Sequence, residues 1–161
     1  YIDLVTGTGP SPEYGQFVTM GYTAYIKLPA SKDNPNPKPA QFDAVSSYLL
    51  KHGNGRSIPG LDEGLHTMKV GGTRRIIIPP KLGYVRSGLG PLPSSPFGRA
   101  KLNRLLQRMI DLKGGTVVYE VKLLGVLDDE ADQGYYQDKS YTPEQMEIFN
   151  QKMLNGMNSG S

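Results

Sequence analysis

The 161-residue sequence predicts an α+β domain that is rich in short strands. Its 20 glycines and 13 prolines indicate many turns between short elements. Residues 15–27, 73–78 and 116–127 are rich in β-branched and aromatic residues, which favour strands. Residues 61–68 and 99–112 instead place their apolar side chains at helical spacing. A chain of this length can bury one hydrophobic core without disulfides.

The first third of the chain is predicted to hold two strands and a long loop. Residues 1–5 are a candidate first strand, and the loosely alternating residues 15–27 are the second. Residues 29–40 contain four prolines and no periodicity, so they are predicted to form a loop. Extended structure restarts at 41–43, and a short apolar patch at 48–50 precedes a turn.

The centre of the chain predicts a short helix followed by a strand. Pro59 stands just ahead of the helical residues 61–68. Asp62 and Glu63 fall in the first turn, where acidic side chains favour a helix N-terminus. A glycine turn then leads into the strand at 73–78.

The next segment predicts a loop, a helix and the last strand. Residues 85–98 are rich in Gly, Pro and Ser and are interpreted as a loop. The helix over 99–112 is predicted to end at Gly114 and Gly115. Residues 116–127 then form a strongly apolar strand pattern.

Residues 128–161 are predicted to be an acidic extension of a basic domain formed by residues 1–127. The domain has 16 Lys/Arg and 8 Asp/Glu, a charge of +8, whereas the extension has 2 and 7, a charge of −5. A basic domain with an acidic extension is a candidate arrangement for binding a partner. The alternative is that the extension lies on the basic surface of its own domain, or that both are simply solvated. Thr142 begins a capping-box pattern that predicts a short helix, and residues 154–161 are expected to be disordered.

Several kinds of site are excluded by composition. The absence of cysteine rules out a disulfide framework, a zinc site with Cys ligands and a thiol nucleophile. No apolar run is long enough to span a bilayer as a helix. His52 and His66 are the only histidines, and their spacing is not that of metal ligands, so both are expected at the surface. The sequence therefore predicts neither a metal nor a cofactor.

Four segments occur in the order seen in a known family. They read VTMGYTAYI at 18–26, QFDA at 41–44, IPGLDEGLHTMKVGGTRRIIIPP at 58–80 and TVVYEVKLLGVL at 116–127. Together they resemble the FKBP family of peptidyl-prolyl cis-trans isomerases, and the central segment is the most specific of the four. The resemblance implies a twisted antiparallel sheet wrapped around a short helix, with a ligand cleft between them. It also implies insertions at about 29–40 and 85–115.

The resemblance also implies which residues line the cleft. The apolar walls would hold a proline ring, while the Ile58 N–H and the Tyr84 hydroxyl would hold substrate carbonyls. Asp43 would lie at the rim, oriented by the Tyr22 hydroxyl. For any single aromatic residue, plain core packing is the alternative. The implied catalytic residues are Tyr22, Phe42, Asp43 and Tyr84, and the implied substrate-binding residues are Tyr48, Ile58, Leu61 and Tyr119.

The sequence departs from the family pattern in four places, and two of them, the lost floor tryptophan and the lost overhanging loop, are expected to weaken catalysis. Leu61 stands where the family usually has a tryptophan at the floor of the cleft. Tyr48 and Tyr119 stand where Phe is common, and their hydroxyls need partners if they are buried. Gly83 precedes and Val85 follows the cleft tyrosine, where the family commonly has Ala and Gly. Residues 85–115 replace a compact overhanging loop. We therefore expect low or absent activity on short peptides.

The expected function is isomerisation of Xaa-Pro bonds in proteins by a weakened folding helper, a type of chaperone. The alternative is a non-catalytic assembly factor or structural subunit of a larger, photosynthetic membrane complex. RRIIIPPKLGY at 74–84 and FGR at 97–99 resemble divergent FKBPs of the chloroplast thylakoid lumen in plants and algae, which implies that location.

The predicted helix at 99–113 is a candidate partner-binding surface. It has an apolar stripe framed by arginines, and packing on its own sheet is the alternative. Nucleic acid is the least expected partner, because the opposite face is apolar and no aromatics interleave with the basic residues. The residues of the candidate surface are Leu102, Arg104, Leu105, Arg108 and Met109.

Overall fold

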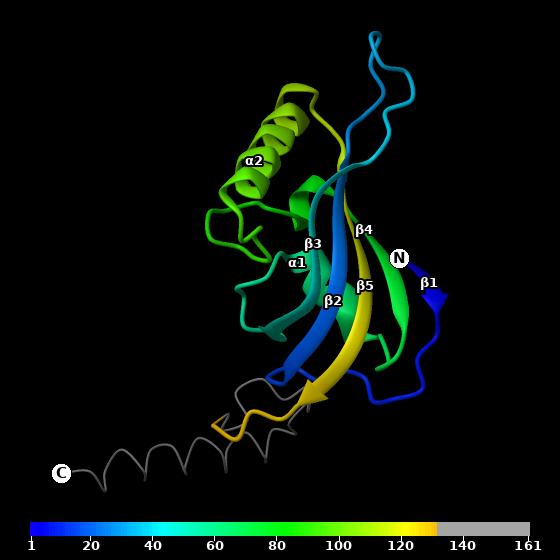
Figure 1. The fold of residues 1–161 in the computed structure, drawn as a ribbon, viewed down its shortest axis with the longest axis vertical. Helices are drawn as coiled ribbons and strands as arrows, with labels where there is room; N and C mark the ends of the chain where they lie inside the picture. Colours follow the sequence, from blue (N-terminus) through cyan, green and yellow to red (C-terminus); the bar gives the residue numbers. More distant parts are fainter. Residues whose placement is uncertain (132–161) are drawn as a thin grey trace, which may run out of the picture.

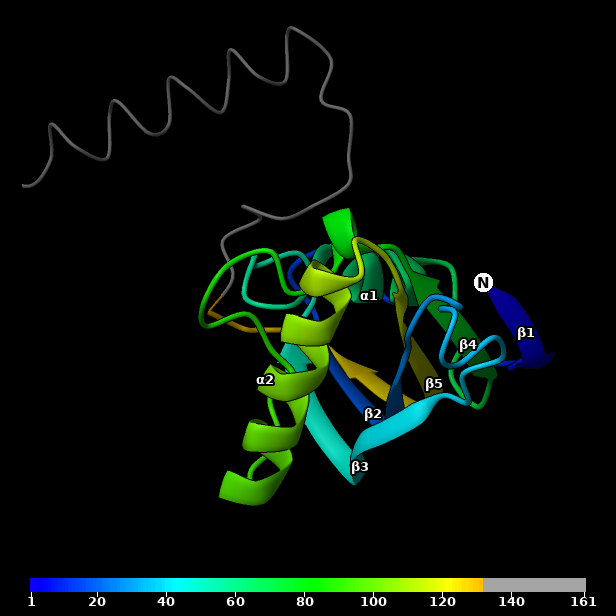
Figure 2. The same cartoon turned by 90° about the horizontal axis from the view of Figure 1, so that it is seen from above.

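The computed structural model describes residues 1–131 as a five-stranded antiparallel sheet with two helices on one side (Figures 1 and 2). The strand order is β1-β4-β5-β2-β3, so the last strand in sequence lies at the centre. The predicted α+β class is confirmed. The elements are β1 (Ile2–Val5), β2 (Phe17–Lys27), β3 (Ala40–Lys51), α1 (Pro59–His66), β4 (Thr73–Ile78), η1 (Pro80–Leu82), α2 (Pro96–Asp111) and β5 (Thr116–Leu127).

Two elements extend beyond their predicted bounds. The extended residues 41–43 and the apolar patch 48–50 belong to a single long strand, β3. The helix α2 begins three residues earlier than predicted, because Ser95 caps it by accepting a hydrogen bond from the Gly98 N–H at 3.0 Å. The predicted helix at Thr142 and the predicted disorder at 154–161 lie outside the described residues.

The core lies between the inner face of the sheet and α1. Alternate residues of β2 are buried, as expected of a strand with one face in the core. Two glycines, one helical turn apart, let α1 approach β4 closely. A Cβ added at Gly60 would lie 2.6 Å from the Cγ2 of Ile78, and one at Gly64 would lie 2.6 Å from the Cδ1 of Ile76. The two glycines therefore determine how close the helix lies to the sheet.

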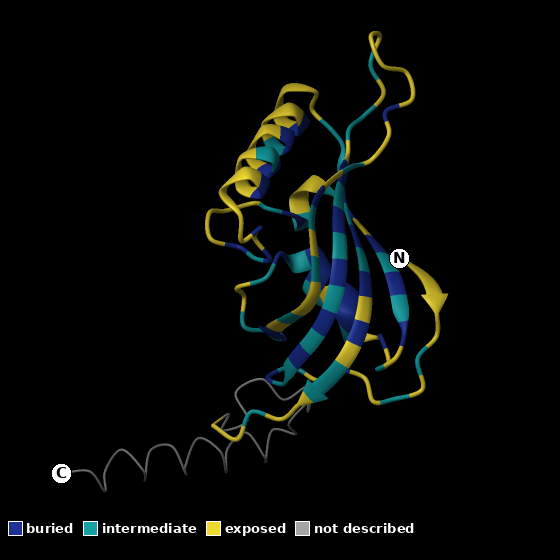
Figure 3. Ribbon diagram, viewed as in Figure 1, coloured by how far each residue is buried: buried dark blue, intermediate teal, exposed yellow. Residues whose placement is uncertain are grey.

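The apolar face of α2 packs inside the protein. Leu102, Leu105 and Met109 are buried, while Arg104 and Arg108 are exposed. Buried and exposed stretches alternate along α2 (Figure 3). This corrects the prediction that the three apolar residues form an accessible partner-binding stripe. The physical reason is that α2 lies against β3 and covers its own apolar face there.

His52 is fully buried, so its predicted surface position is wrong. It follows β3, and its ring lies 2.6 Å from an Asp62 carboxylate oxygen through Nδ1 and 2.9 Å from His66 Nδ1 through Nε2. The ring of Tyr14 stacks on the His66 imidazole and lies tilted against that of His52. Burial is tolerated because both ring nitrogens have hydrogen-bond partners. Within residues 1–131, no group of three or more acidic or imidazole side chains is arranged to hold a metal ion.

Arg74 is a buried cation that the sequence did not single out. Its guanidinium binds both carboxylate oxygens of Asp3, at 2.6 and 3.1 Å, and donates to the Gly64 carbonyl at 2.9 Å. These bonds link the edge strand β1 to the end of α1, and hydrogen bonding to Arg74 lowers the pKa of Asp3. No helix among the described residues combines the length and apolarity needed to cross a membrane.

The close approach of α1 to β4 gives a stability prediction. Gly64→Ala is expected to lower the free energy of unfolding by about 1–3 kcal/mol, because the added methyl group meets the buried Ile76 side chain. Exposed Glu63, on the same helix, provides the control, and Glu63→Ala should change stability by no more than about 0.5 kcal/mol. Urea denaturation measures both, and equal stabilities would contradict the close-packing account.

Candidate functional site

The residues that the resemblance assigned to a cleft lie together in the structure. They come from three strands, the start of α1 and the turn after η1, and they surround the space between the sheet and α1. The Tyr119 ring is central, with its centroid 5.2 Å from that of Tyr22 and 6.3 Å from that of Phe42. The residues brought together are Tyr22, Phe42, Asp43, Tyr48, Ile58, Leu61, Tyr84 and Tyr119.

Two tyrosine hydroxyls form a chain that ends on a backbone carbonyl. The Tyr84 hydroxyl donates to the Pro91 carbonyl at 2.6 Å and lies 2.6 Å from the Tyr119 hydroxyl. Because Tyr84 has one hydroxyl hydrogen and uses it on Pro91, Tyr119 must donate to Tyr84. Tyr119 is fully buried, so this bond supplies the partner that its hydroxyl requires.

A second hydroxyl orients the carboxylate at the rim. The Tyr22 hydroxyl donates to Asp43 Oδ2 at 2.7 Å, and Asp43 remains partly exposed. Burial, followed by this hydrogen bond, raises the pKa of Tyr22 well above its usual range. Burial likewise raises the pKa of Tyr84 and of Tyr119. All three hydroxyls are therefore neutral donors near neutral pH.

The loop at 85–98 enters the site, which the sequence did not predict. The Ile58 N–H donates to the Gly90 carbonyl at 2.9 Å, and the Gly90 N–H donates to the Arg56 carbonyl at 2.8 Å. The two groups expected to hold substrate carbonyls, the Ile58 N–H and the Tyr84 hydroxyl, thus hold two consecutive carbonyls of the chain itself. The only signal in the sequence was the Leu-Gly-Pro-Leu-Pro run within a segment interpreted as a plain loop.

Both ends of this loop are attached to the protein. Arg86 donates through Nη2 to the Gly55 carbonyl at 2.9 Å, and Arg99 donates through Nε to the Pro93 carbonyl at 2.7 Å. Arg99 belongs to α2, so the helix and the loop ahead of it form one connected insertion. Within the insertion, α2 lies against β3 (Figure 1), and the loop ahead of it is hydrogen-bonded to the segment before α1.

Two hollows near the sheet differ in their relation to the cleft. A cavity of about 340 Å³ adjoins Tyr84 on its α2 side and is lined mainly by apolar residues, including Leu106 and Val117. A larger hollow of about 920 Å³ lies on the outer face of the sheet, beneath the proline-rich loop, and contains none of the cleft residues. Leu61, at the floor of the cleft, is fully buried.

The fold and the site together define the class of protein. Residues 9–124 match the family model described as FKBP-type peptidyl-prolyl cis-trans isomerase. The chain therefore belongs to the FKBP family.

Among the curated proteins, the chain is 31% identical over 134 residues to the chloroplastic peptidyl-prolyl cis-trans isomerase FKBP17-1 of Arabidopsis thaliana, covering 76% of this chain and 57% of the relative. It is 38% identical over 96 residues to chloroplastic FKBP16-3 of the same plant, covering 60% and 40% respectively. The chain thus spans about half the length of the curated relatives it matches. In fold it is similar to crystalline FkpA from Escherichia coli, with a TM-score of 0.50, 23% identity and coverage of 78% of this chain and 46% of that chain.

The raised tyrosine pKa values predict alkaline instability. The folded chain keeps these protons where the unfolded chain loses them, so their contribution to stability is complete below the usual tyrosine pKa of 10.0 and is lost as pH rises above it. Tyrosinate absorbance should show that these tyrosines ionise only as the protein unfolds. Tyr119→Phe should make the loss of stability with pH less steep. Ionisation of every tyrosine at its usual pH, without unfolding, would contradict the prediction.

Proposed function

We propose that this chain binds Xaa-Pro segments of proteins in the cleft between the sheet and α1, and isomerises them at a low rate. The supporting observation is how the cleft holds the chain's own Gly90-Pro91 unit. The Ile58 N–H donates to the carbonyl before the proline, and the Tyr84 hydroxyl donates to the carbonyl of the proline itself. The same two groups can donate hydrogen bonds to the carbonyls of an Xaa-Pro unit from another chain.

The chemistry follows from the nature of the amide bond. Rotation about an amide breaks its resonance, which creates a barrier of roughly 18–20 kcal/mol. The twisted amide has less charge separation than the planar one, so an apolar cleft built from Phe42, Leu61 and Tyr119 favours the twisted state. Fixed donors hold the flanking carbonyls while the bond turns. The reaction makes and breaks no covalent bond, so it needs no nucleophile.

Two features support a rate below that of typical family members. Leu61 replaces the larger aromatic floor and offers no indole N–H. The two carbonyl-holding donors are already bonded within the chain, so an external substrate must compete for them. Both features reduce the binding energy available to the twisted state.

A protease-free isomerisation assay on Xaa-Pro peptides tests this function. We expect slow catalysis by the natural chain, and Tyr84→Phe should lower kcat/KM by about tenfold, the effect of losing a hydrogen bond worth about 1.4 kcal/mol. The Phe42→Ala, Tyr84→Ala double variant should abolish catalysis. Tyr25→Phe, on the outer face of the sheet, is the matched control and should keep the full rate.

Two results would count against this function. A rate equal to that of a typical family member would contradict the weakened cleft. Slow catalysis that survives in the double variant would show that the cleft is not its source.

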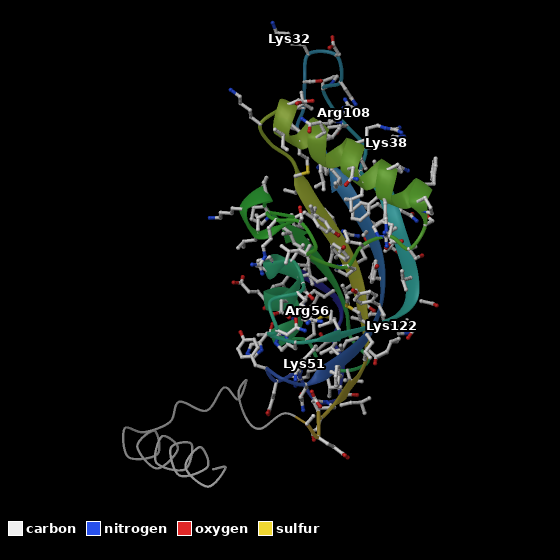
Figure 4. The ribbon with its side chains drawn as sticks, turned by 90° about the vertical axis from the view of Figure 1, so that its left-hand side faces the viewer. Lys32, Lys38, Lys51, Arg56, Arg108 and Lys122 are labelled. Carbon is white, nitrogen blue, oxygen red and sulfur yellow. The ribbon has the colours of Figure 1, made fainter. Side chains whose placement is uncertain are left out.

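A second candidate function is that of a non-catalytic assembly factor, and the outer face of α2 supports it. Arg104 and Arg108 are exposed, one turn apart, and neither forms an ion pair with an acid in residues 1–131. Arg108 lies toward the same end of the molecule as Lys32 and Lys38 (Figure 4). This basic end suits an acidic surface on a larger complex. The similarity to chloroplastic plant proteins and the motifs at 74–84 and 97–99 support a chloroplast location. Within the chloroplast, we propose the thylakoid lumen.

Fractionated chloroplasts of the source organism test the second candidate and the location together. The chain should appear in the lumen fraction and elute in a large assembly at low salt. Arg104→Glu with Arg108→Glu should release it as a free chain, whereas Lys69→Glu, exposed after α1, should not. Elution as a free chain without any mutation would contradict the assembly role, and recovery in the stroma would contradict the location.

A further inference from the structure

Residues 89–93, here called the inserted segment, are bound in the cleft as a peptide ligand would be. Gly90 forms a short parallel bridge with the segment before α1, through the Ile58 N–H at 2.9 Å and the Arg56 carbonyl at 2.8 Å. The Tyr84 hydroxyl then holds the next carbonyl, that of Pro91, at 2.6 Å. Three hydrogen bonds thus fix two consecutive residues, with the proline second.

The side chains of the inserted segment alternate between the protein interior and solvent. Leu89 is 4% exposed, and Pro91 and Pro93 are also buried. Leu92, between the two prolines, is 41% exposed. An extended peptide lying in a groove buries alternate side chains in this way. The burial pattern therefore agrees with the hydrogen bonds in showing a bound, extended segment.

The hydrogen bonds make this occupancy exclusive. A backbone N–H and a tyrosine hydroxyl each have one hydrogen to donate. While the inserted segment is bound, neither the Ile58 N–H nor the Tyr84 hydroxyl can hold a carbonyl of another chain. The Tyr119 hydroxyl cannot replace them, because it donates to Tyr84.

We propose that the inserted segment is an internal ligand of the cleft and must leave before an external Xaa-Pro segment can bind. The preferred external ligand has the same chemistry as the inserted segment: an apolar residue, then glycine, then proline. The inference rests on the proposed function, since it takes the cleft to be a site for Xaa-Pro segments.

The preference for glycine follows from the space around Gly90. A Cβ added there would lie 3.0 Å from the Tyr48 hydroxyl oxygen, closer than an ordinary van der Waals contact. The Tyr48 ring is itself held edge-on against Tyr22, at 5.7 Å between centroids. A larger residue before the proline must therefore push the Tyr48 hydroxyl aside, so Tyr48 is the residue that we expect to favour glycine at this position.

The internal ligand reduces the apparent affinity for every external one. A tethered segment competes at an effective concentration on the order of millimolar. The measured Kd is the intrinsic Kd divided by the fraction of molecules whose cleft is empty. Variants that loosen the segment should therefore bind external peptide more tightly, although they add no contact to it.

The test uses the full chain and a fluorescein-labelled, end-blocked peptide, Leu-Gly-Pro-Leu-Pro, in a fluorescence anisotropy titration. The release variant is Leu89→Ser with Pro91→Ser, which removes two of the three buried apolar side chains of the segment and leaves Pro93 in place. Leu92→Ser is the matched control, because Leu92 faces solvent in the same segment. Hydrogen exchange of the Ile58 amide reports independently whether the segment has left the cleft.

We expect the release variant to bind the peptide at least about tenfold more tightly than the natural chain, with Leu92→Ser unchanged. Its Ile58 amide should exchange rapidly and become protected again when peptide is added. A peptide with leucine in place of the glycine should bind more weakly. In a Tyr48→Phe variant, the difference in affinity between the two peptides should be smaller. Equal affinity for the two peptides would overturn the glycine preference.

The remaining outcomes distinguish failure of the internal-ligand inference from failure of the proposed Xaa-Pro binding function. Equally tight binding by the natural chain and the release variant would overturn the internal ligand and leave the proposed function standing. A release variant whose Ile58 amide exchanges rapidly but which binds no peptide would overturn the proposed function and the inference with it. If the release variant does not fold, Gly90→Leu takes its place, because the new side chain would crowd the Tyr48 hydroxyl and is expected to loosen the segment.

Discussion

The close contact between α1 and β4 is the constraint on which the rest of the site depends. Gly60 and Gly64 have no side chains, so the helix lies directly against Ile76 and Ile78 of the strand. This contact fixes the start of the helix, where Ile58 offers its N–H to the cleft. The first N–H groups of a helix have no acceptor within the helix, so the Ile58 N–H can donate to the carbonyl of a peptide in the cleft.

Within residues 1–131, the buried side chains of Arg74, His52 and Tyr119 each form hydrogen bonds with other elements of the fold. Arg74 joins an edge strand to the end of α1, and His52 joins the end of β3 to Asp62 and His66 on α1. The Tyr119 hydroxyl reaches Tyr84, and through it the inserted segment. Because an unsatisfied buried polar group is costly, these bonds hold strands, helix and insertion in one arrangement.

The insertion leaves the donors and aromatic walls of the cleft in place but fills its two donor positions with the chain's own backbone. Aromatic walls, a carboxylate held by the Tyr22 hydroxyl and two carbonyl-holding donors are all present. The insertion supplies an Xaa-Pro unit to those donors and places α2 against β3. Under the proposed function, catalysis and the binding of an external Xaa-Pro segment depend on the same event, because both need the inserted segment to leave the donors of Ile58 and Tyr84.

The sequence by itself determined the α+β class, because strand and helix periodicity are local properties. The order of its motifs determined the resemblance to the FKBP family, and that resemblance, rather than periodicity, implied which residues surround the cleft. The resemblance placed Tyr22 beside Asp43, and the hydrogen bond between them is present in the structure. Only the tertiary structure decided that Gly90 and Pro91 occupy the donors of Ile58 and Tyr84, that His52 is buried, and that the apolar face of α2 lies against β3. Periodicity shows which face of an element is apolar, but what covers that face depends on contacts between segments far apart in the chain.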